Sequence, residues 1–270
     1  MFELAAARLE DPALAPPTRL QIVTFTSSAA YAAMLITQGI VPGVCLPHSM
    51  GLYAALVTSG ACEFEPMLDF VVRTGQAIDA FSRSGDYDMV SVLGLDSEKV
   101  EGICRRIPDA YVGNYNSVGH TVVSGRREAV MAAIEEARRM DCYDTRPLGT
   151  GVPLHTPIMN AVRGQLLETL RGFSVSRPRL AVMCPYRTRL LRKGDIIPAL
   201  ADHIRMPVRF EQMVRAVAGT GVRAVLEVGY DRLLSRFVSW IDPGIRSRSV
   251  ASSRALAREA RRRQPIERVQ

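Results

Sequence analysis

The chain has 270 residues, of which 47% are apolar, and its 34 basic and 27 acidic side chains give a net charge of +7. This length and apolar content can bury a substantial core, which excludes an intrinsically disordered chain and fits one large domain or a large domain with a small insert. The positive charge favours acidic partners through long-range attraction, but it says nothing about the fold.

Cysteine use and the lengths of apolar runs indicate the compartment. The five cysteines lie far apart, with no CxxC pair, and this pattern argues against a zinc site or a disulfide framework and for a reducing environment. The first residues lack the basic start and apolar core of a signal peptide. No apolar run approaches the roughly 20 residues that a membrane span needs. We therefore expect a soluble, cytoplasmic protein without a membrane partner.

The first part of the chain alternates helix-forming and strand-forming patterns. Residues 1–12 predict a short helix, and an alanine-rich helix follows over residues 18–38. Residues 41–46 form a short apolar run that Pro47 ends, and residues 50–59 again show a helical pattern. This region is predicted to be a strand, a tight turn and a helix in succession.

The middle of the chain has the pattern of a small α+β unit. Two β-branched runs predict strands, each followed by an amphipathic helix, at residues 89–93, 97–106, 120–124 and 126–139. Two such pairs in close succession are typical of a ferredoxin-like arrangement. We predict a small subdomain over residues 88–149, inserted into a larger one formed by residues 1–87 and 150–270.

The last third alternates helices and strands once more. A helix is predicted first, then a strand, a helix, a strand and a final helix, at residues 157–171, 180–184, 210–218, 224–228 and after Gly229. Such alternation predicts a mostly parallel sheet. The predicted fold class is therefore α/β: a hydrolase-like, mostly parallel sheet flanked by helices, with the ferredoxin-like subdomain inserted. The arginine-rich end, residues 254–268, is interpreted as a solvated tail.

Ser49 is the candidate nucleophile. It lies on the predicted turn between the strand at 41–46 and the helix at 50–59, where backbone N–H groups and the helix dipole favour a developing oxyanion. A tight turn of this kind favours small residues on either side of the serine; Gly51 fits and Pro47 does not. The alternative is that Ser49 only caps the helix. The local pattern leaves both interpretations open.

Several segments in chain order resemble a known family. They are PHSMGLYAALV, LGLD, NYNSVGH, VPLHTPIM and LEVG, at residues 47–57, 93–96, 114–120, 152–159 and 226–229. They resemble the nucleophile signature, the entry to the small subdomain, the NxNSPGQ motif, the active-histidine loop and a late strand of malonyl-CoA:acyl-carrier-protein transacylases and polyketide synthase acyltransferase domains. The ordered matches extend from Thr18 to Arg236, so coincidence at one motif does not explain them.

The resemblance implies covalent acyl transfer. Ser49 would attack the thioester of an acyl-CoA, and His155 would take the serine proton and later protonate the leaving thiolate, because a serine hydroxyl is a weak nucleophile without a positioned base. The acyl group, malonyl by family default, would pass to the phosphopantetheine thiol of an acyl carrier protein in fatty-acid or polyketide synthesis. The backbone N–H of Met50 would be one oxyanion donor. Coenzyme A thioester is a substrate, and no bound cofactor or metal is expected.

The sequence departs from the family pattern at three places. The family begins with a strand and a GQG loop that supplies a second oxyanion donor, and this chain is expected to start downstream of them. The family's carboxylate-binding arginine aligns with Thr74, while Arg73 lies one residue earlier. Either Arg73 contacts the acyl group after a local shift, or the pocket prefers a neutral acyl group. His203 replaces a glutamine whose main-chain carbonyl orients the catalytic histidine, and this carbonyl role is expected to remain.

Other functions fit the same residues. With water as acceptor, Ser49 and His155 would form an acyl hydrolase, and a decayed site would leave a non-catalytic carrier-binding homologue. Nucleic acid is not an expected partner, because the positive charge is diffuse outside the tail and no binding motif is present. Two further histidines have expected structural roles: His48 shapes the nucleophile turn, and His120 starts a strand.

Overall fold

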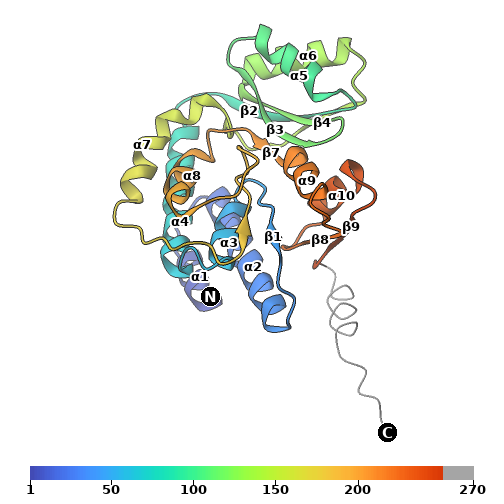
Figure 1. Ribbon diagram of the computed structural model, residues 1–270. Coiled ribbons are helices and arrows are strands. Elements are labelled where there is room, and N and C mark those ends of the chain that lie inside the picture. Colours follow the sequence, from blue (N-terminus) through green and yellow to red (C-terminus); the bar gives the residue numbers. More distant parts are fainter. Residues whose placement is uncertain (252–270) are drawn as a thin grey trace.

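The computed structural model describes residues 1–251, and its larger part consists mostly of helices (Figure 1). The predicted arginine-rich tail lies outside the described residues. The first elements are α1 Phe2–Leu9, α2 Pro16–Thr37, β1 Val44–Cys45, α3 Gly51–Thr58 and α4 Phe64–Ser82. After residue 150 follow η1 Pro157–Met159, α7 Asn160–Thr169, β6 Ala181–Val182, η2 Lys193–Asp195, α8 Ile196–Asp202, β7 Val208–Arg209, α9 Phe210–Ala218, β8 Ala224–Glu227, α10 Leu233–Ile241 and β9 Arg246–Ser249.

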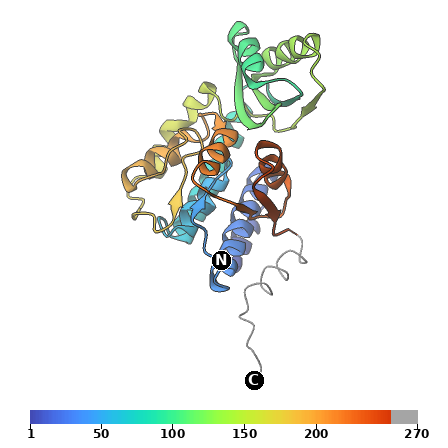
Figure 2. The same ribbon diagram turned by 45° about the vertical axis from the view of Figure 1, so that its right-hand side comes forward.

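The middle of the chain folds into a separate sheet, called the middle sheet below, which lies at one end of the molecule in both views (Figures 1 and 2). Its elements are β2 Tyr87–Leu93, α5 Ser97–Arg106, β3 Ala110–Ser117, β4 His120–Arg126, α6 Arg127–Arg139 and β5 Asp144–Pro147. The strands lie in the order β5-β2-β4-β3 with antiparallel pairing, which is the ferredoxin-like arrangement. We propose residues 88–149 as a subdomain, because the core beneath α5 and α6 draws its buried members from residues 90–137.

Outside the middle sheet the strands pair in parallel, as predicted, but each parallel ladder is short. β1 pairs with β6, β8 with β9, and β7 with the edge strand β3, all in parallel. β1 and β6 are only two residues long. Pro42 and Pro47 explain the brevity of β1, because proline donates no backbone hydrogen bond to a ladder. The α/β class is as predicted, and β7 joins the middle sheet from outside the predicted subdomain boundary.

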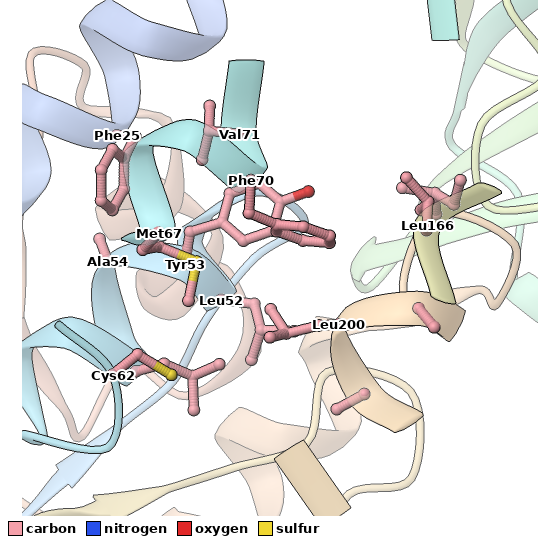
Figure 3. Packing of buried hydrophobic residues seen from close by; sticks show 14 of the residues in the cluster. Phe25, Leu52, Tyr53, Ala54, Cys62, Met67, Phe70, Val71, Leu166 and Leu200 are labelled. Atoms are coloured by element: carbon pink, nitrogen blue, oxygen red, sulfur yellow. The ribbon is translucent and has the colours of Figure 1, made fainter. Parts of the chain in front are cut away.

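A helical core lies directly behind the turn that carries Ser49. α3 buries five of its eight residues, so it is a helix surrounded by protein. Figure 3 shows Tyr53 of this helix against Phe70 of α4, with the ring centroids 5.9 Å apart. Gly75 lets α2 and α4 approach closely, because a Cβ at this position would lie within 2.5 Å of the Thr18 hydroxyl. The Ser49 turn is therefore supported by a close-packed base.

One described helix is long and apolar on average, although it contains no continuous apolar run. Among the described helices, α2 is long and apolar enough to cross a membrane, by length and composition alone. The core helix of a soluble protein passes the same test, and α2 packs against α3 and α4 with Ile22 and Phe25 fully buried. Its alanine, serine and threonine residues separate the large apolar side chains, so no uninterrupted apolar run stands out in the sequence.

Candidate active site

Ser49 lies on a sharp turn between β1 and α3. Its φ of 50° places it in the left-handed region, which residues with a Cβ adopt only when their surroundings require it. The helix-cap alternative is wrong, since α3 has no side-chain cap and the Ser49 hydroxyl bonds to His155 instead. A Cβ at Gly51 would make only ordinary contact with Pro47, at 3.9 Å. The turn therefore accommodates Pro47 and does not itself require glycine at position 51.

His155 lies within hydrogen-bonding distance of Ser49 and is held by main-chain carbonyls. Its Nε2 is 2.8 Å from Ser49 Oγ, while Nδ1 lies 2.9 Å from the carbonyl of His203 and 3.2 Å from that of Met206. Carbonyls only accept, so Nδ1 carries the proton and the Nε2 lone pair faces the serine hydroxyl. The ring is thus arranged to take a proton from Ser49.

Electrostatics keep His155 in its neutral form. Burial is the largest cause that lowers the pKa of His155 to about 3; nearby His203 acts in the same direction, and the Nδ1 bond to the His203 carbonyl partly opposes both. The side chain is only 3% exposed. Because burial disfavours the charged imidazolium, the ring is a base, not an acid, when it first meets the serine proton at neutral pH.

The amide of Met50 is available to an oxyanion. The three amides that follow it, those of Gly51, Leu52 and Tyr53, donate to carbonyls of the turn itself. Within residues 1–251 nothing accepts from the Met50 N–H. This N–H lies next to the Ser49 side chain at the start of α3, where a helix favours negative charge.

His203 contributes its carbonyl, and its ring has a separate set of contacts. The ring Nδ1–H donates to the Leu200 carbonyl at 2.9 Å, and its edge packs on Tyr53 with the centroids 4.9 Å apart. Burial lowers the pKa of His203 to about 4, so a neutral ring stands beside His155. The ring is a buried packing element, and the carbonyl provides the link to His155.

Arg73 and Thr74 lie on different faces of α4. Thr74 is completely buried beside Tyr53, with Phe70 and Ala77 on the same face. Arg73 is exposed, since one residue on a helix is about 100° of rotation. The structure therefore does not bring Arg73 to the buried face with Thr74. No lysine or arginine is buried anywhere in the described part of the chain.

His48 and His120 both contact side chains of the middle sheet. His48 Nε2 lies 2.8 Å from Asn116 Oδ1, and its ring packs edge-on against Phe210. His120 Nε2 lies 3.2 Å from the Ser91 hydroxyl, and burial lowers the pKa of His120 to about 4. Asn116 is the neighbour that the sequence did not single out, although it belongs to the quoted NYNSVGH segment.

An ion triad anchors the segment that supplies the two carbonyls. Asp202 Oδ1 accepts from Arg163 Nε at 2.5 Å and from Arg205 Nε at 3.0 Å. Asp202 is only 6% exposed. Burial alone would raise the pKa of Asp202, but the bonds from the two arginines outweigh it and lower the pKa. The triad thus ties the loop before Met206 to α7 and keeps Asp202 ionised.

Replacing Asp202 with asparagine is expected to lower the free energy of unfolding by about 1–2 kcal/mol, because the two hydrogen bonds from the arginines lose the carboxylate charge that strengthens them, while the arginines can still reach water. Urea unfolding at neutral pH measures this loss. The folded-state pKa is lowered, so the contribution is fully present above the ordinary aspartate pKa and disappears as the pH falls through the lowered value. The exposed Arg8–Asp69 pair is the control: Asp69→Asn should cost less than about 1 kcal/mol. Equal losses would contradict the expectation.

Ser49 lies on a strand-to-helix turn of an α/β fold and is hydrogen-bonded to His155 Nε2, while His155 Nδ1 is bonded to a main-chain carbonyl. This arrangement defines the class of serine-dependent acyl-transfer proteins. The family model described as acyl transferase domain matches residues 11–264, and the chain belongs to this family. The malonyl CoA-acyl carrier protein transacylase of Bacillus subtilis is 26% identical over 236 residues, which cover 86% of this chain and 74% of the relative. The protein of the same name from Escherichia coli K12 is 27% identical over 241 residues, covering 87% and 78%.

Solved structures agree with the fold. The malonyl-CoA:acyl carrier protein transacylase of Xanthomonas oryzae has a TM-score of 0.89 at 26% identity, covering 96% of this chain and 87% of that one. The transacylase of Coxiella burnetii has a TM-score of 0.90 at 24% identity, covering 97% and 88%. A type II polyketide synthase acyl-carrier protein was solved in complex with its malonyl-transacylase, whose fold matches with a TM-score of 0.90 at 24% identity.

Proposed function

We propose that this protein moves an acyl group from coenzyme A to the phosphopantetheine thiol of an acyl carrier protein, with Ser49 as nucleophile and His155 as base. The observation that carries the proposal is the 2.8 Å contact between Ser49 Oγ and His155 Nε2. The other nitrogen of the same ring, Nδ1, donates to the His203 carbonyl. Membership of the acyl transferase family supports the reaction type. The relatives from Bacillus subtilis and Escherichia coli are malonyl CoA-acyl carrier protein transacylases, and their names supply the proposed substrates, malonyl-CoA and acyl carrier protein.

The reaction has two matched halves. First, Ser49 Oγ attacks the thioester carbonyl while its proton passes to His155 Nε2, and the Met50 N–H donates to the oxyanion. The carbon–sulfur bond then breaks, and His155 returns the proton to the coenzyme A thiolate. Next, His155 takes the proton of the carrier thiol, whose sulfur attacks the acyl-serine ester. The carbon–oxygen bond breaks and Ser49 regains the proton.

The same proposal defines what the protein uses and where it works. The acyl-CoA thioester is consumed as substrate, and the side chains of the site supply the base and the nucleophile without a bound cofactor. Among the described residues, no group of three or more histidine, cysteine or acidic side chains could hold a metal ion. The five thiols are unpaired, which fits a reducing cytoplasm.

Carrier loading tests the proposed function directly. The protein is incubated with malonyl-CoA, with and without a phosphopantetheine-bearing carrier, and intact masses are followed over time. A malonyl adduct on this protein, followed by the same mass increase on the carrier, is the expected result. Thiol release without carrier loading would instead support hydrolysis, and the absence of both adduct and release would support a non-catalytic carrier-binding protein.

The faces of α4 predict weak selectivity between acyl groups. Hydrogen bonds to a charged group are worth about 1.5–3 kcal/mol, or roughly 10- to 150-fold in binding, and a buried arginine would give that advantage to a malonyl carboxylate. Arg73 is exposed and Thr74 occupies the buried face instead. We expect kcat/KM for acyl-enzyme formation from malonyl-CoA and acetyl-CoA to differ by less than about tenfold.

Single-turnover acylation with each thioester measures this ratio. The Arg73→Gln variant is the matched control, because removal of an exposed side chain should leave the ratio unchanged. A malonyl preference above about 100-fold that Arg73→Gln abolishes would show that Arg73 contacts the acyl group after all.

A further inference from the structure

The residue before the nucleophile is held by the middle sheet. His48 precedes Ser49, and its Nε2–H donates to Asn116 Oδ1 of β3 at 2.8 Å. Asn116 is 5% exposed, and the Phe210 ring makes an edge-on contact with the His48 ring, with the centroids 5.5 Å apart. The His48 carbonyl in turn accepts from the Gly51 amide at 2.9 Å and closes the turn. His48 therefore contacts the middle sheet through its side chain and closes the serine turn through its main-chain carbonyl.

The residue before the histidine is held by the same sheet. Leu154 precedes His155, and its carbonyl accepts from the Ser124 hydroxyl of β4 at 2.8 Å. Ser124 is completely buried. At Gly113 of β3, an added Cβ would lie 3.3 Å from the Leu154 carbonyl oxygen and 3.7 Å from His155 Cβ. The sheet backbone thus lies directly against the loop that carries His155.

Both reacting residues need such support. Ser49 has a φ of 50° and His155 a φ of 65°, which are left-handed conformations that cost free energy for residues with a Cβ. Such conformations persist when the surroundings fix them, and each one here follows a residue that the middle sheet holds. The two sheet contacts come from neighbouring, paired strands, so they share one rigid frame.

We propose that Asn116 and Ser124 are positioning residues, through which the middle sheet sets the Ser49 Oγ to His155 Nε2 geometry. They act through His48 and Leu154 and touch neither reacting atom. The inference rests on the proposed acyl-serine mechanism. A small displacement of a reacting group costs rate more than binding, so the expected signature is a fall in the acylation rate constant with little change in KM.

The Asn116 test compares two replacements of similar size. Asn116→Asp keeps an acceptor for the His48 Nε2–H, whereas Asn116→Leu removes it. We expect Asn116→Leu to lower the single-turnover acylation rate constant about 10- to 100-fold with KM for acyl-CoA within about threefold, and Asn116→Asp to restore most of the rate. In a His48→Ala background, Asn116→Leu should cause no further loss, because the interaction it removes is already absent.

The Ser124 test has a matched control in the same hairpin. Ser117 is also buried, but its hydroxyl has no hydrogen-bond partner in the described structure. Ser124→Ala should slow acylation about tenfold or more, and Ser117→Ala should not. Urea unfolding midpoints of all variants identify losses caused by instability. If Asn116→Leu does not fold, the pair of serine variants decides.

The outcomes separate the two proposals. A wild-type protein that forms no acyl-serine adduct would contradict the proposed function. A wild type that acylates normally, with Asn116→Leu equal to wild type or Ser124→Ala equal to Ser117→Ala, would overturn the positioning role alone. A rate loss in Asn116→Leu that Asn116→Asp fails to recover would also overturn the acceptor argument.

Discussion

Replacing Ser49 with alanine is expected to lower the rate of carrier loading by at least about 10⁴-fold, because covalent catalysis then lacks the hydroxyl that bonds to His155. The Ser49 hydroxyl is the one placed 2.8 Å from His155 Nε2, at the start of a helix where the Met50 amide is free to donate. Intact-mass measurement after incubation with malonyl-CoA should show one acyl adduct on the wild type. The variant should show none.

The control for this variant is the same substitution at an exposed serine outside the candidate site. Ser84 is exposed, and its hydroxyl donates only to the Phe81 carbonyl nearby. Ser84→Ala should therefore acylate like the wild type. An adduct on Ser49→Ala with the same mass as the wild-type adduct would contradict the acyl-serine mechanism. Peptide mapping would then identify the residue that carries the acyl group.

Much of the fold could be predicted from local patterns, and the failures have physical causes. The helices over residues 97–106 and 210–218 have the predicted bounds, because their amphipathic periods are strong. β3 and β5 were missed: β3 contains two asparagines and two bulges, and β5 is a four-residue edge strand ending in proline. A parallel sheet was inferred from alternation, yet prolines around β1 limit its ladder to two residues.

The candidate nucleophile and base could be proposed from motifs that contain them, and their contact is present in the structure. Residues that reach the candidate site only through contacts distant in sequence could not be found in this way. The strand-turn-helix pattern pointed to Ser49, and the resemblance pointed to His155. Asn116 contacts His48 across 68 residues of sequence, and Ser124 contacts Leu154 across 30, so no local pattern could reveal them. The position of Arg73 depends on the rotation of α4, which the alignment left open and the burial of Thr74 determines.

The acylation rate of the wild type is expected to stay nearly flat from about pH 8 down to about pH 5, because His155 acts as a base and burial lowers its pKa to about 3. Only the neutral ring can take the serine proton, so the rate should fall as the pH approaches that lowered value. A histidine with an ordinary pKa would instead lose half of its activity near pH 6.5. His155→Gln should reduce the rate about 10²- to 10⁴-fold and remove the acid limb.

Acid also lowers stability, and the measurement must separate the two effects. The pKa values of His155 and His203 are lowered in the folded protein, so both rings stay neutral there in mild acid. In the unfolded chain the same rings bind protons at this pH. Stability should therefore fall as the pH drops from about 6.5 toward the lowered values. Protein kept at neutral pH and mixed with acid for one turnover reports the rate before unfolding occurs. A half-maximal rate near pH 6.5 in such a jump, with full recovery on return to neutral pH, would mean that the ring opposite Ser49 is solvated in the working enzyme.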